Sequence, residues 1–321
     1  MIKKLVFLNL LLALTGVTHA TDVFPSKPIT IVVPFAAGGP NDVLARMLQD
    51  PLGKAFGQPV VIENKVGATG IIGTQFVKNA KPDGHTLLVG GTSTITAVMV
   101  QKKPSYDPAK DLVPLNFFGG FPVIVLANPS LPAKNMKELI DYAKANPGVI
   151  NYGTSGPGAI SHFGTELLSQ KTGISMQAIP YQGTAPVMIA LLQGDIKLHL
   201  AAPTAAVTSY IAAGRLRALA ITSPKPAEIA PGLATVAETV PGYSVQSWFG
   251  LLAPAGTPPD VLAKIEAAVT TITSSPQWKE KVWTSLGLPA HSLDRQQFRD
   301  YFASEIKLWS EVANKGALIS E

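Results

Sequence analysis

The segment ITIVVPFAAGGPND, residues 29–42, decides the fold class of this chain. Its first half, from Ile29 to Phe35, is rich in β-branched residues and predicts a buried strand. Small residues and Gly38-Gly39-Pro40 follow, and apolar side chains from Leu44 to Leu52 then recur at helical spacing. We expect Pro51 to kink or end this helix. A strand, a glycine-rich loop and a helix in this order are typical of an α/β protein.

The same order of strand, glycine-rich loop and helix recurs in the middle of the chain. Residues 150–153 predict a strand, residues 153–158 read GTSGPG, and Ile160, Phe163 and Leu167 lie on one face of the helix that follows. Strand-like runs alternate with helical patterns from residue 29 to residue 252. This alternation predicts largely parallel sheets, and a length of 321 residues suggests two domains.

Several helix starts are predicted from single residues. Asn135, with Glu138 three residues later, has the spacing of a capping box. We expect Thr184 and Thr257 each to cap the helix that follows it. The chain beyond Thr257 reads as helical, and its aromatic residues predict a packed terminal helix pair that contains Trp278, Trp283 and Trp309.

The composition excludes several classes of protein. Hydrophobic residues make up 46% and charged residues 15%, which is far from the composition of a disordered chain. There is no Cys, so disulfides, Cys-ligated zinc, iron–sulfur clusters and a thiol nucleophile are excluded. Lys and Arg do not cluster among aromatic residues, and we therefore expect no nucleic-acid partner.

The first twenty residues have the pattern of a secretory signal peptide. Lys3 and Lys4 form a charged start, residues 5–14 form an apolar run, and small residues at Thr18 and Ala20 predict a cut after Ala20. The run is too short for a membrane-spanning helix, which needs about 20 residues. We expect the mature chain to be exported; an uncleaved membrane anchor is the alternative.

Known catalytic motifs are incomplete in this chain. Residues 153–157 approach the nucleophile elbow G-x-S-x-G, but Pro157 replaces the last Gly. Residues 156–161 approach the dinucleotide fingerprint but end in Ser161. We therefore expect no catalytic residues, no cofactor and no metal. The last expectation also follows from the His residues of the mature chain, none of which lies four residues from another: His85, His162, His199 and His291.

Loops at the ends of predicted strands are the best candidates for a binding site. In residues 35–42 and 153–162, small residues lead into a helix N-terminus, where backbone N–H groups and the helix dipole favour an anion. Residues 90–94 and 181–186 have a similar design. Asp42 is interpreted first as an acid that stabilises the first turn of its helix. Tight packing turns are the alternative explanation, but together the loops predict a cleft at the carboxyl ends of two sheets.

A set of motifs, taken in order and spacing, resembles the substrate-binding proteins of tripartite tricarboxylate transporters, also called the Bug family. The resemblance covers essentially the whole mature chain, and its specificity comes from the combination of motifs. The matching segments are Pro34–Gly39 with Asp42, Glu63-Asn64 with Gly67-Ala68 and Gly70, Pro82–Gly84, Gly153–Gly158 with His162, Pro180–Pro186, Gly214–Ala220 and Ala253–Pro258.

The resemblance implies a two-lobed periplasmic binding protein, a type II-like Venus flytrap that closes on its ligand. Each lobe would be a mainly parallel sheet flanked by helices. Lobe 1 would comprise residues 22–122 and 245–321, and lobe 2 would comprise residues 123–244. The two chain crossings would form the hinge. The implied location is the periplasm, and we expect a monomer.

The resemblance also implies the ligand and the residues that hold it. The ligand would be a small carboxylate, either a di- or tricarboxylate or an aromatic acid, and loops of both lobes would grip it, often through water. The residues implied in lobe 1 are Phe35, Ala37, Gly38, Pro40, Asp42, Thr92 and Ser93. Those implied in lobe 2 are Thr154, Ser155, Gly158, His162, Tyr181, Gly183 and Ala202.

One departure from the family bears on the ligand. Relatives often have an acidic residue after the strand predicted at 196–200, where this chain has Ala201-Ala202-Pro203, and many carry Asp near Ile189. The missing acids argue against a ligand with an ammonium group and leave a plain or aromatic carboxylate. Lys65-Val66 replaces the more usual Arg-Pro, which we expect to affect a loop rather than the site.

The implied partners are the membrane permease subunits of a tripartite tricarboxylate transporter, which would recognise the closed form. A sensor that presents the same ligand to a histidine kinase would have an identical site and is an alternative. A secreted α/β enzyme acting on a carboxylate is a weaker alternative, because no nucleophile–base pair is recognised.

Overall fold

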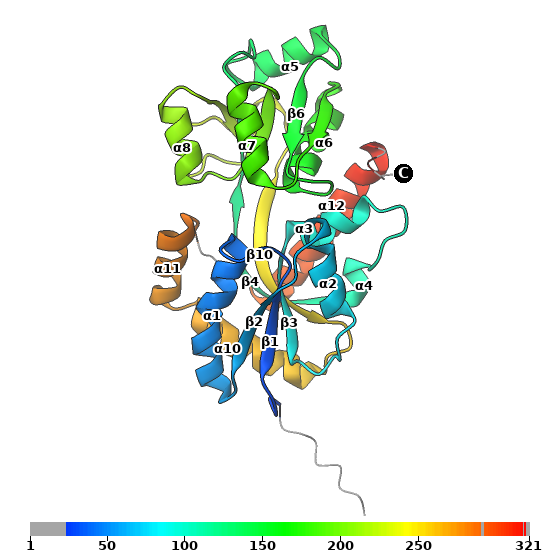
Figure 1. Ribbon diagram of the computed structural model, residues 1–321, viewed down its shortest axis with the longest axis vertical. Helices are drawn as coiled ribbons and strands as arrows, with labels where there is room; N and C mark the ends of the chain where they lie inside the picture. The colour runs from blue at the N-terminus through cyan, green and yellow to red at the C-terminus, as the bar shows by residue number, and fades with distance from the viewer. Residues whose placement is uncertain (1–23, 290–291, 317, 319–321) are drawn as a thin grey trace, which may run out of the picture.

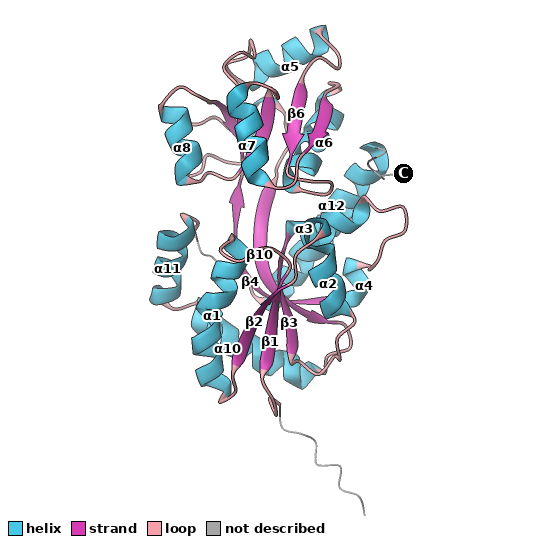
Figure 2. Ribbon diagram, in the orientation of Figure 1, coloured by secondary structure: helices cyan, strands magenta, loops and turns pink. Residues whose placement is uncertain are grey.

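The computed structural model describes residues 24–289, 292–316 and 318. The predicted signal peptide and His291 lie outside these residues. Within them the strands form two five-stranded sheets, each flanked by helices, and the predicted two-lobed α/β fold is confirmed (Figures 1 and 2). None of the described helices combines the length and the apolar character needed to cross a membrane.

The first sheet has the strand order β2-β1-β3-β10-β4. β1 pairs in parallel with β2 and β3, whereas β10 pairs antiparallel with both β3 and β4. Four strands therefore point the same way, and the inverted strand is the one that returns from the other lobe. The strands are β1 (Ile29–Val33), β2 (Val60–Asn64), β3 (Thr86–Gly91), β4 (Leu112–Pro122) and β10 (Gln246–Pro254).

The second sheet repeats this design with the order β7-β6-β8-β5-β9. β6 pairs in parallel with β7 and β8, and β5 pairs antiparallel with β8 and β9. Here too the inverted strand, β5, is the first to arrive from the other lobe. The strands are β5 (Ile124–Ala127), β6 (Asn151–Thr154), β7 (Gln177–Pro180), β8 (Leu198–Ala201) and β9 (Arg217–Ile221).

Helices connect the strands of both sheets (Figure 2). With the first sheet lie the short 3₁₀ helix η1 (Ala68–Gly70) and the helices α1 (Pro40–Phe56), α2 (Ile71–Lys78), α3 (Thr92–Met99), α4 (Pro108–Asp111), α10 (Pro259–Thr273), α11 (Pro276–Leu286) and α12 (Arg295–Gly316). With the second lie α5 (Met136–Ala145), α6 (Ile160–Thr172), α7 (Thr184–Gln193), α8 (Ala205–Ala212) and α9 (Val236–Thr239).

Helix α1 shows how the opening segment folds. Leu44, Leu48 and Leu52 are buried on one face of the helix, and α1 packs against β2 and β3. The helix continues through Pro51 to Phe56, so Pro51 does not end it. Pro51 is exposed, and burial of the leucine face on both sides of it outweighs the cost of a helical proline, about 3 kcal/mol.

Of the predicted helix caps, one is confirmed and two are wrong. The Asn135 side chain accepts a hydrogen bond from the Glu138 N–H, as the capping-box spacing predicts. Thr184 is the first residue of α7, and Gly183 occupies the cap position. Thr257 donates its hydroxyl to the Pro254 carbonyl, in a turn before α10. In both failures the turn that precedes the helix decides which residue is the cap.

Thr222 holds together the segments in which the chain passes between the sheets. Its buried hydroxyl accepts a hydrogen bond from the Val123 N–H at 2.8 Å and donates to the Val245 carbonyl at 2.6 Å. Its backbone N–H and carbonyl bond the same two residues. Val123 lies between β4 and β5, and Val245 directly precedes β10. The two crossings are therefore joined side by side (Figure 1).

Helix α12 packs on the first sheet and also reaches the second lobe. It contacts β4 and α3, and it contacts α6, where the Gln170 side chain donates to the Val312 carbonyl at 2.8 Å. The predicted aromatic packing is correct for Trp278 and Trp309, which are buried. It is wrong for Trp283, which is 54% exposed on α11.

Glu305 of α12 is a buried acid in this packing. It is 8% exposed and accepts a hydrogen bond from the Trp309 indole N–H at 2.9 Å. Burial raises its pKa from 4.5 to about 7, against the lowering effect of the hydrogen bond. The folded protein therefore holds this proton more tightly than the unfolded chain does. The stability that this preference contributes is complete below pH 4.5 and is lost as the pH rises to 7.

We predict that Thr222→Val lowers the free energy of unfolding by about 1–3 kcal/mol, because it leaves a buried N–H and a buried carbonyl without their partner. Thr222→Ser keeps the hydroxyl and is the control. Urea denaturation of both variants measures the difference. A loss for Ser without a loss for Val would show that the methyl group, not the hydroxyl, is important.

We predict that Glu305→Gln stabilises the protein relative to wild type at pH 8, by about 2 kcal/mol, and has little effect near pH 4.5. The amide resembles the protonated acid, so the variant avoids the buried charge that wild type carries above pH 7. Denaturation curves across this pH range measure the difference. Glu311→Gln, at an exposed position of the same helix, is the control, and a pH-independent difference for Glu305→Gln would contradict the assignment.

Candidate functional site

A cleft of about 750 Å³ lies between the lobes. Its walls come from the segments that follow β1, β2, β3, β6 and β7, at the carboxyl ends of these parallel strands. β10 runs in the opposite direction, so it contributes its beginning, Ser247–Phe249. A single cleft thus collects the strand ends of both sheets.

The structure divides the predicted site residues into two groups. Phe35, Thr92, Ser93, Ser155, Tyr181 and Gly183 line the cleft. The lining does not include Ala37, Gly38, Pro40, Asp42, Thr154, Gly158, His162 or Ala202. Residues 90–94 also differ from the predicted loop, because β3 extends through Gly91 and α3 begins at once with Thr92.

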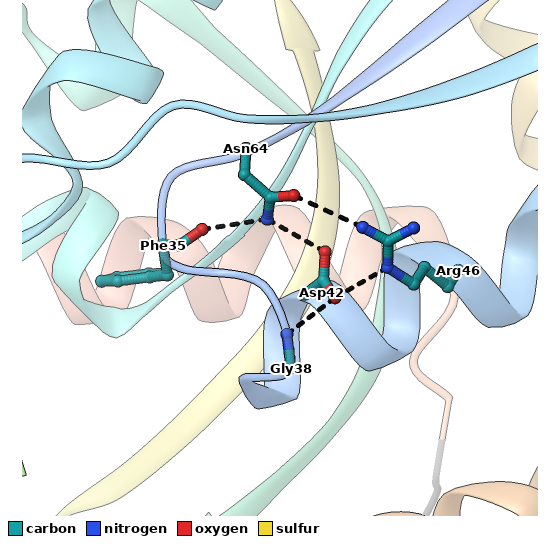
Figure 3. Close-up of polar contacts among 5 residues, drawn as sticks. All are labelled: Phe35, Gly38, Asp42, Arg46 and Asn64. Carbon is teal, nitrogen blue, oxygen red and sulfur yellow. Dashed lines mark hydrogen bonds and ion pairs between the residues drawn. The ribbon is translucent and has the colours of Figure 1, made fainter.

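Asp42 supports the first loop from behind (Figure 3). Its carboxylate accepts hydrogen bonds from the Gly38 N–H at 2.9 Å, the Arg46 guanidinium at 2.8 Å and the Asn64 amide at 2.9 Å. Asn64 also donates to the Phe35 carbonyl. Burial opposes ionisation of Asp42, but these donors outweigh it and lower its pKa to about 2. Asp42 therefore holds residues 35–38 in shape.

Polar side chains hold the second loop in a similar way. The Ser155 N–H donates to the Ser161 hydroxyl at 3.1 Å, and the Gly156 N–H donates to Thr154 Oγ1 at 3.4 Å. The Gly158 N–H donates to His162 Nδ1 at 3.4 Å, which assigns the proton of a neutral ring to Nε2. Burial lowers the pKa of His162, so the ring is neutral at pH 7.

Gly158 contacts the opposite lobe directly. Its carbonyl accepts a buried hydrogen bond from the Thr96 hydroxyl of α3 at 2.6 Å. A Cβ at this position would lie 2.5 Å from the Cα of Ala97, so the backbones approach too closely for any other residue. Ala202 follows β8 and precedes α8. Neither residue borders the space of the cleft.

Sequence reasoning missed two parts of the lining. The first is the turn at residues 66–70, which follows β2. Its glycines, Gly67 and Gly70, were visible as part of a family motif and could have indicated it. The second is Trp248 and Phe249 of β10. No local signal marks these residues, because only the pairing of β10 with β3 and β4 brings them to the cleft.

The lining has no charged side chain among the described residues: it contains no Lys, Arg, His, Asp or Glu. Across the described part of the chain, no three His, Cys, Asp or Glu residues gather in a way that could hold a metal ion. The cleft therefore offers backbone groups, hydroxyls, amides and aromatic rings to a ligand.

Helices that begin at the cleft differ at their N-termini from helices that begin elsewhere. Among the described helices, α1, α2, α3, α6 and α7 begin at the cleft, and their cap residues have no acceptor side chain: Gly39, Gly70, Gly91, Ala159 and Gly183. Those that begin elsewhere are capped by Asp107, Asn135, Thr204, Thr235, Ser275 and Asp294. α10, which follows Pro258, is the exception.

Comparisons with known proteins agree with this architecture. The family described as tripartite tricarboxylate transporter family receptor matches residues 44–318. Protein BugT of Bordetella pertussis is 33% identical over 320 residues, 98% of each chain. A protein of R. palustris solved with adipate is 33% identical, with 92% of this chain and 98% of that chain covered and a TM-score of 0.77. MatC from Rhodopseudomonas palustris, with bound malate, is 32% identical, with 90% and 99% covered and a TM-score of 0.75.

We predict that Asp42→Asn destabilises the protein by about 1–2 kcal/mol at pH 7, a value reduced for solvent screening because Arg46 is half exposed. The depressed pKa means that this stabilisation is present above about pH 4 and is lost as the pH falls to 2. Urea denaturation at pH 7 and pH 3 measures the loss, which shrinks at the lower pH. Asp260→Asn, an exposed acid in the first turn of α10, is the control, and an equal loss there would contradict the supporting role of Asp42.

Proposed function

Because the chain belongs to the tripartite tricarboxylate transporter receptor family, we propose that it captures a small carboxylate in the periplasm and delivers it to the membrane permease subunits of such a transporter. In this proposal residues 22–122 and 245–321 form lobe 1, and residues 123–244 form lobe 2. The signal peptide is cut after Ala20, and the mature protein is a monomer that binds without catalysis. The ligand is a di- or tricarboxylate or an aromatic acid.

The observation that carries this proposal is the set of helices whose N-termini face the cleft without a capping side chain. The first N–H groups of a helix have no partner within the helix, and the helix dipole adds partial positive charge there. Among the described helices that begin elsewhere, all but α10 have a capping side chain, whereas the cap residues at the cleft offer no acceptor and leave these groups to a ligand. An anion is the ligand that such groups favour, and it needs no Lys or Arg.

The rest of the lining suits the organic part of such a ligand. Phe35 and Tyr181, together with the mostly buried Phe249, contribute aromatic surface, and Val66 contributes an aliphatic side chain. The Trp248 ring is fully buried against α12. Adipate and malate, the ligands of the two solved relatives, are both small carboxylates. The lack of a charged side chain in the described lining supports a ligand without an ammonium group.

The division of the lining between the lobes supports binding by closure. Phe35 and Thr92 come from lobe 1, and Ser155 and Tyr181 come from lobe 2. A ligand that contacts both sets stabilises the form in which they are close, and its affinity depends on the difference between the open and closed forms. We expect the crossings joined by Thr222 to act as the hinge.

We predict that a thermal-shift and calorimetry screen identifies carboxylate ligands among C4–C6 dicarboxylates, tricarboxylates and aromatic acids. A ligand at 100 times its dissociation constant adds about 2.7 kcal/mol to stability. Neutral amides of the same acids are the matched controls, because they keep the shape and remove the charge. If amides bind as well as acids, or no acid binds, the carboxylate assignment is wrong.

The same screen with Ala159→Asp tests the role of the helix N-termini. Ala159 caps α6, lines the cleft and has φ −68° and ψ 156°, which an Asp cap readily adopts. The new carboxylate would accept hydrogen bonds from the first N–H groups of α6 and would repel an anion there. We therefore expect the affinity for the carboxylate ligand to fall tenfold or more, while the free energy of unfolding without ligand changes by less than about 1 kcal/mol. Ala159→Ser, a neutral cap, should weaken binding less. Unchanged affinity in the Asp variant would exclude α6 from the site.

A further inference from the structure

Residues 67–70, Gly-Ala-Thr-Gly, form a turn in which every residue has a positive φ. The φ angles are 141° for Gly67, 48° for Ala68, 53° for Thr69 and 95° for Gly70. Glycine adopts this region freely, but a β-branched residue such as Thr rarely does. Thr69 is therefore held in an unfavourable backbone conformation, which a glycine at this position would adopt without strain.

The Thr69 side chain lies where the two lobes meet. Its hydroxyl oxygen would be 3.1 Å from a Cβ placed on Gly156, which belongs to the loop before α6. Both residues line the cleft. Because Gly156 has no side chain, the Thr69 hydroxyl can approach the opposite lobe at this point.

Two polar side chains of the cleft lining already have partners within the protein. The Asn41 amide donates to the carbonyls of Val89 and Gly90, and the Thr92 hydroxyl accepts from the Trp248 N–H. The half-buried Thr69 hydroxyl, like the side chains of Ser93, Gln182 and Ser247, forms no hydrogen bond with a described residue. It is available to a ligand in the cleft.

We propose that Thr69 is a specificity-determining residue whose hydroxyl donates a hydrogen bond to a carboxylate oxygen of the bound ligand, beside Gly156. This inference rests on the proposed function and adds to it a side-chain donor from lobe 1. Unfavourable backbone conformations persist where surrounding structure and function require them, and this contact supplies the requirement. Gly156 completes the arrangement because it leaves room for the hydroxyl.

The test compares variants of Thr69 with the carboxylate that binds wild type most tightly in the screen above. Thr69→Val keeps the branched shape and removes the hydroxyl, and Thr69→Ala removes it with less backbone strain. We expect both to bind tenfold or more weakly, as is typical for loss of a hydrogen bond to a charged group. Thr69→Ser keeps the donor and should bind within about twofold of wild type. Thr69→Gly should melt at the same or a higher temperature without ligand, yet bind more weakly.

The outcomes separate this inference from the function on which it rests. Wild type that binds no carboxylate would overturn both. Wild type that binds, together with Thr69→Ala and Thr69→Val that bind equally well, would overturn the role of Thr69 alone. Weak binding by Thr69→Ser as well would also overturn it, because the shape of the side chain rather than its hydroxyl would then decide affinity. The melting temperature of each ligand-free variant shows that it is folded.

Discussion

One hydroxyl, that of Thr222, bonds both segments that carry the chain between the lobes, and the cleft depends on this junction. The inverted strand of each sheet, β5 or β10, begins next to it. Inversion brings the start of β10 to the edge where the parallel strands of the first sheet end. The cleft therefore collects the start of β10 together with the segments that follow the parallel strands of both sheets.

Polar side chains around the cleft stabilise the loops, and backbone groups of these loops face the cleft. Four side chains accept hydrogen bonds from backbone N–H groups of the loops: those of Asp42, Thr154, Ser161 and His162. These bonds aim backbone groups and helix N-termini at the cleft. An anion can then be bound by oriented dipoles, which need no reorganisation when it arrives. A neutral His162 fits this role, because it accepts from the Gly158 N–H and adds no charge of its own.

Several local predictions held because they depend on near neighbours in the chain. The strand predicted at 29–35, which ends at Val33 in the structure, the helix after it and the Asn135 cap are of this kind. Other predictions failed, some because of packing with distant elements and some because of the turn before a helix. Pro51 does not end α1, because the leucine face on either side of it is buried in the core. The Thr257 hydroxyl donates a hydrogen bond to the carbonyl of Pro254, at the end of β10, and so it does not cap α10.

The sequence by itself determined the α/β alternation, the family motifs and the small residues at strand ends, because each is a local pattern of side chains. It also contained the uncapped helix starts at Gly39, Gly91, Ala159 and Gly183, although their meaning depends on knowing which helices meet. Only the tertiary structure decided that Asp42 and His162 lie behind the loops while Thr69 and Tyr181 line the cleft. The reason is physical: a local pattern places a residue on an element, but the direction in which its side chain faces depends on strands and lobes far away in the sequence.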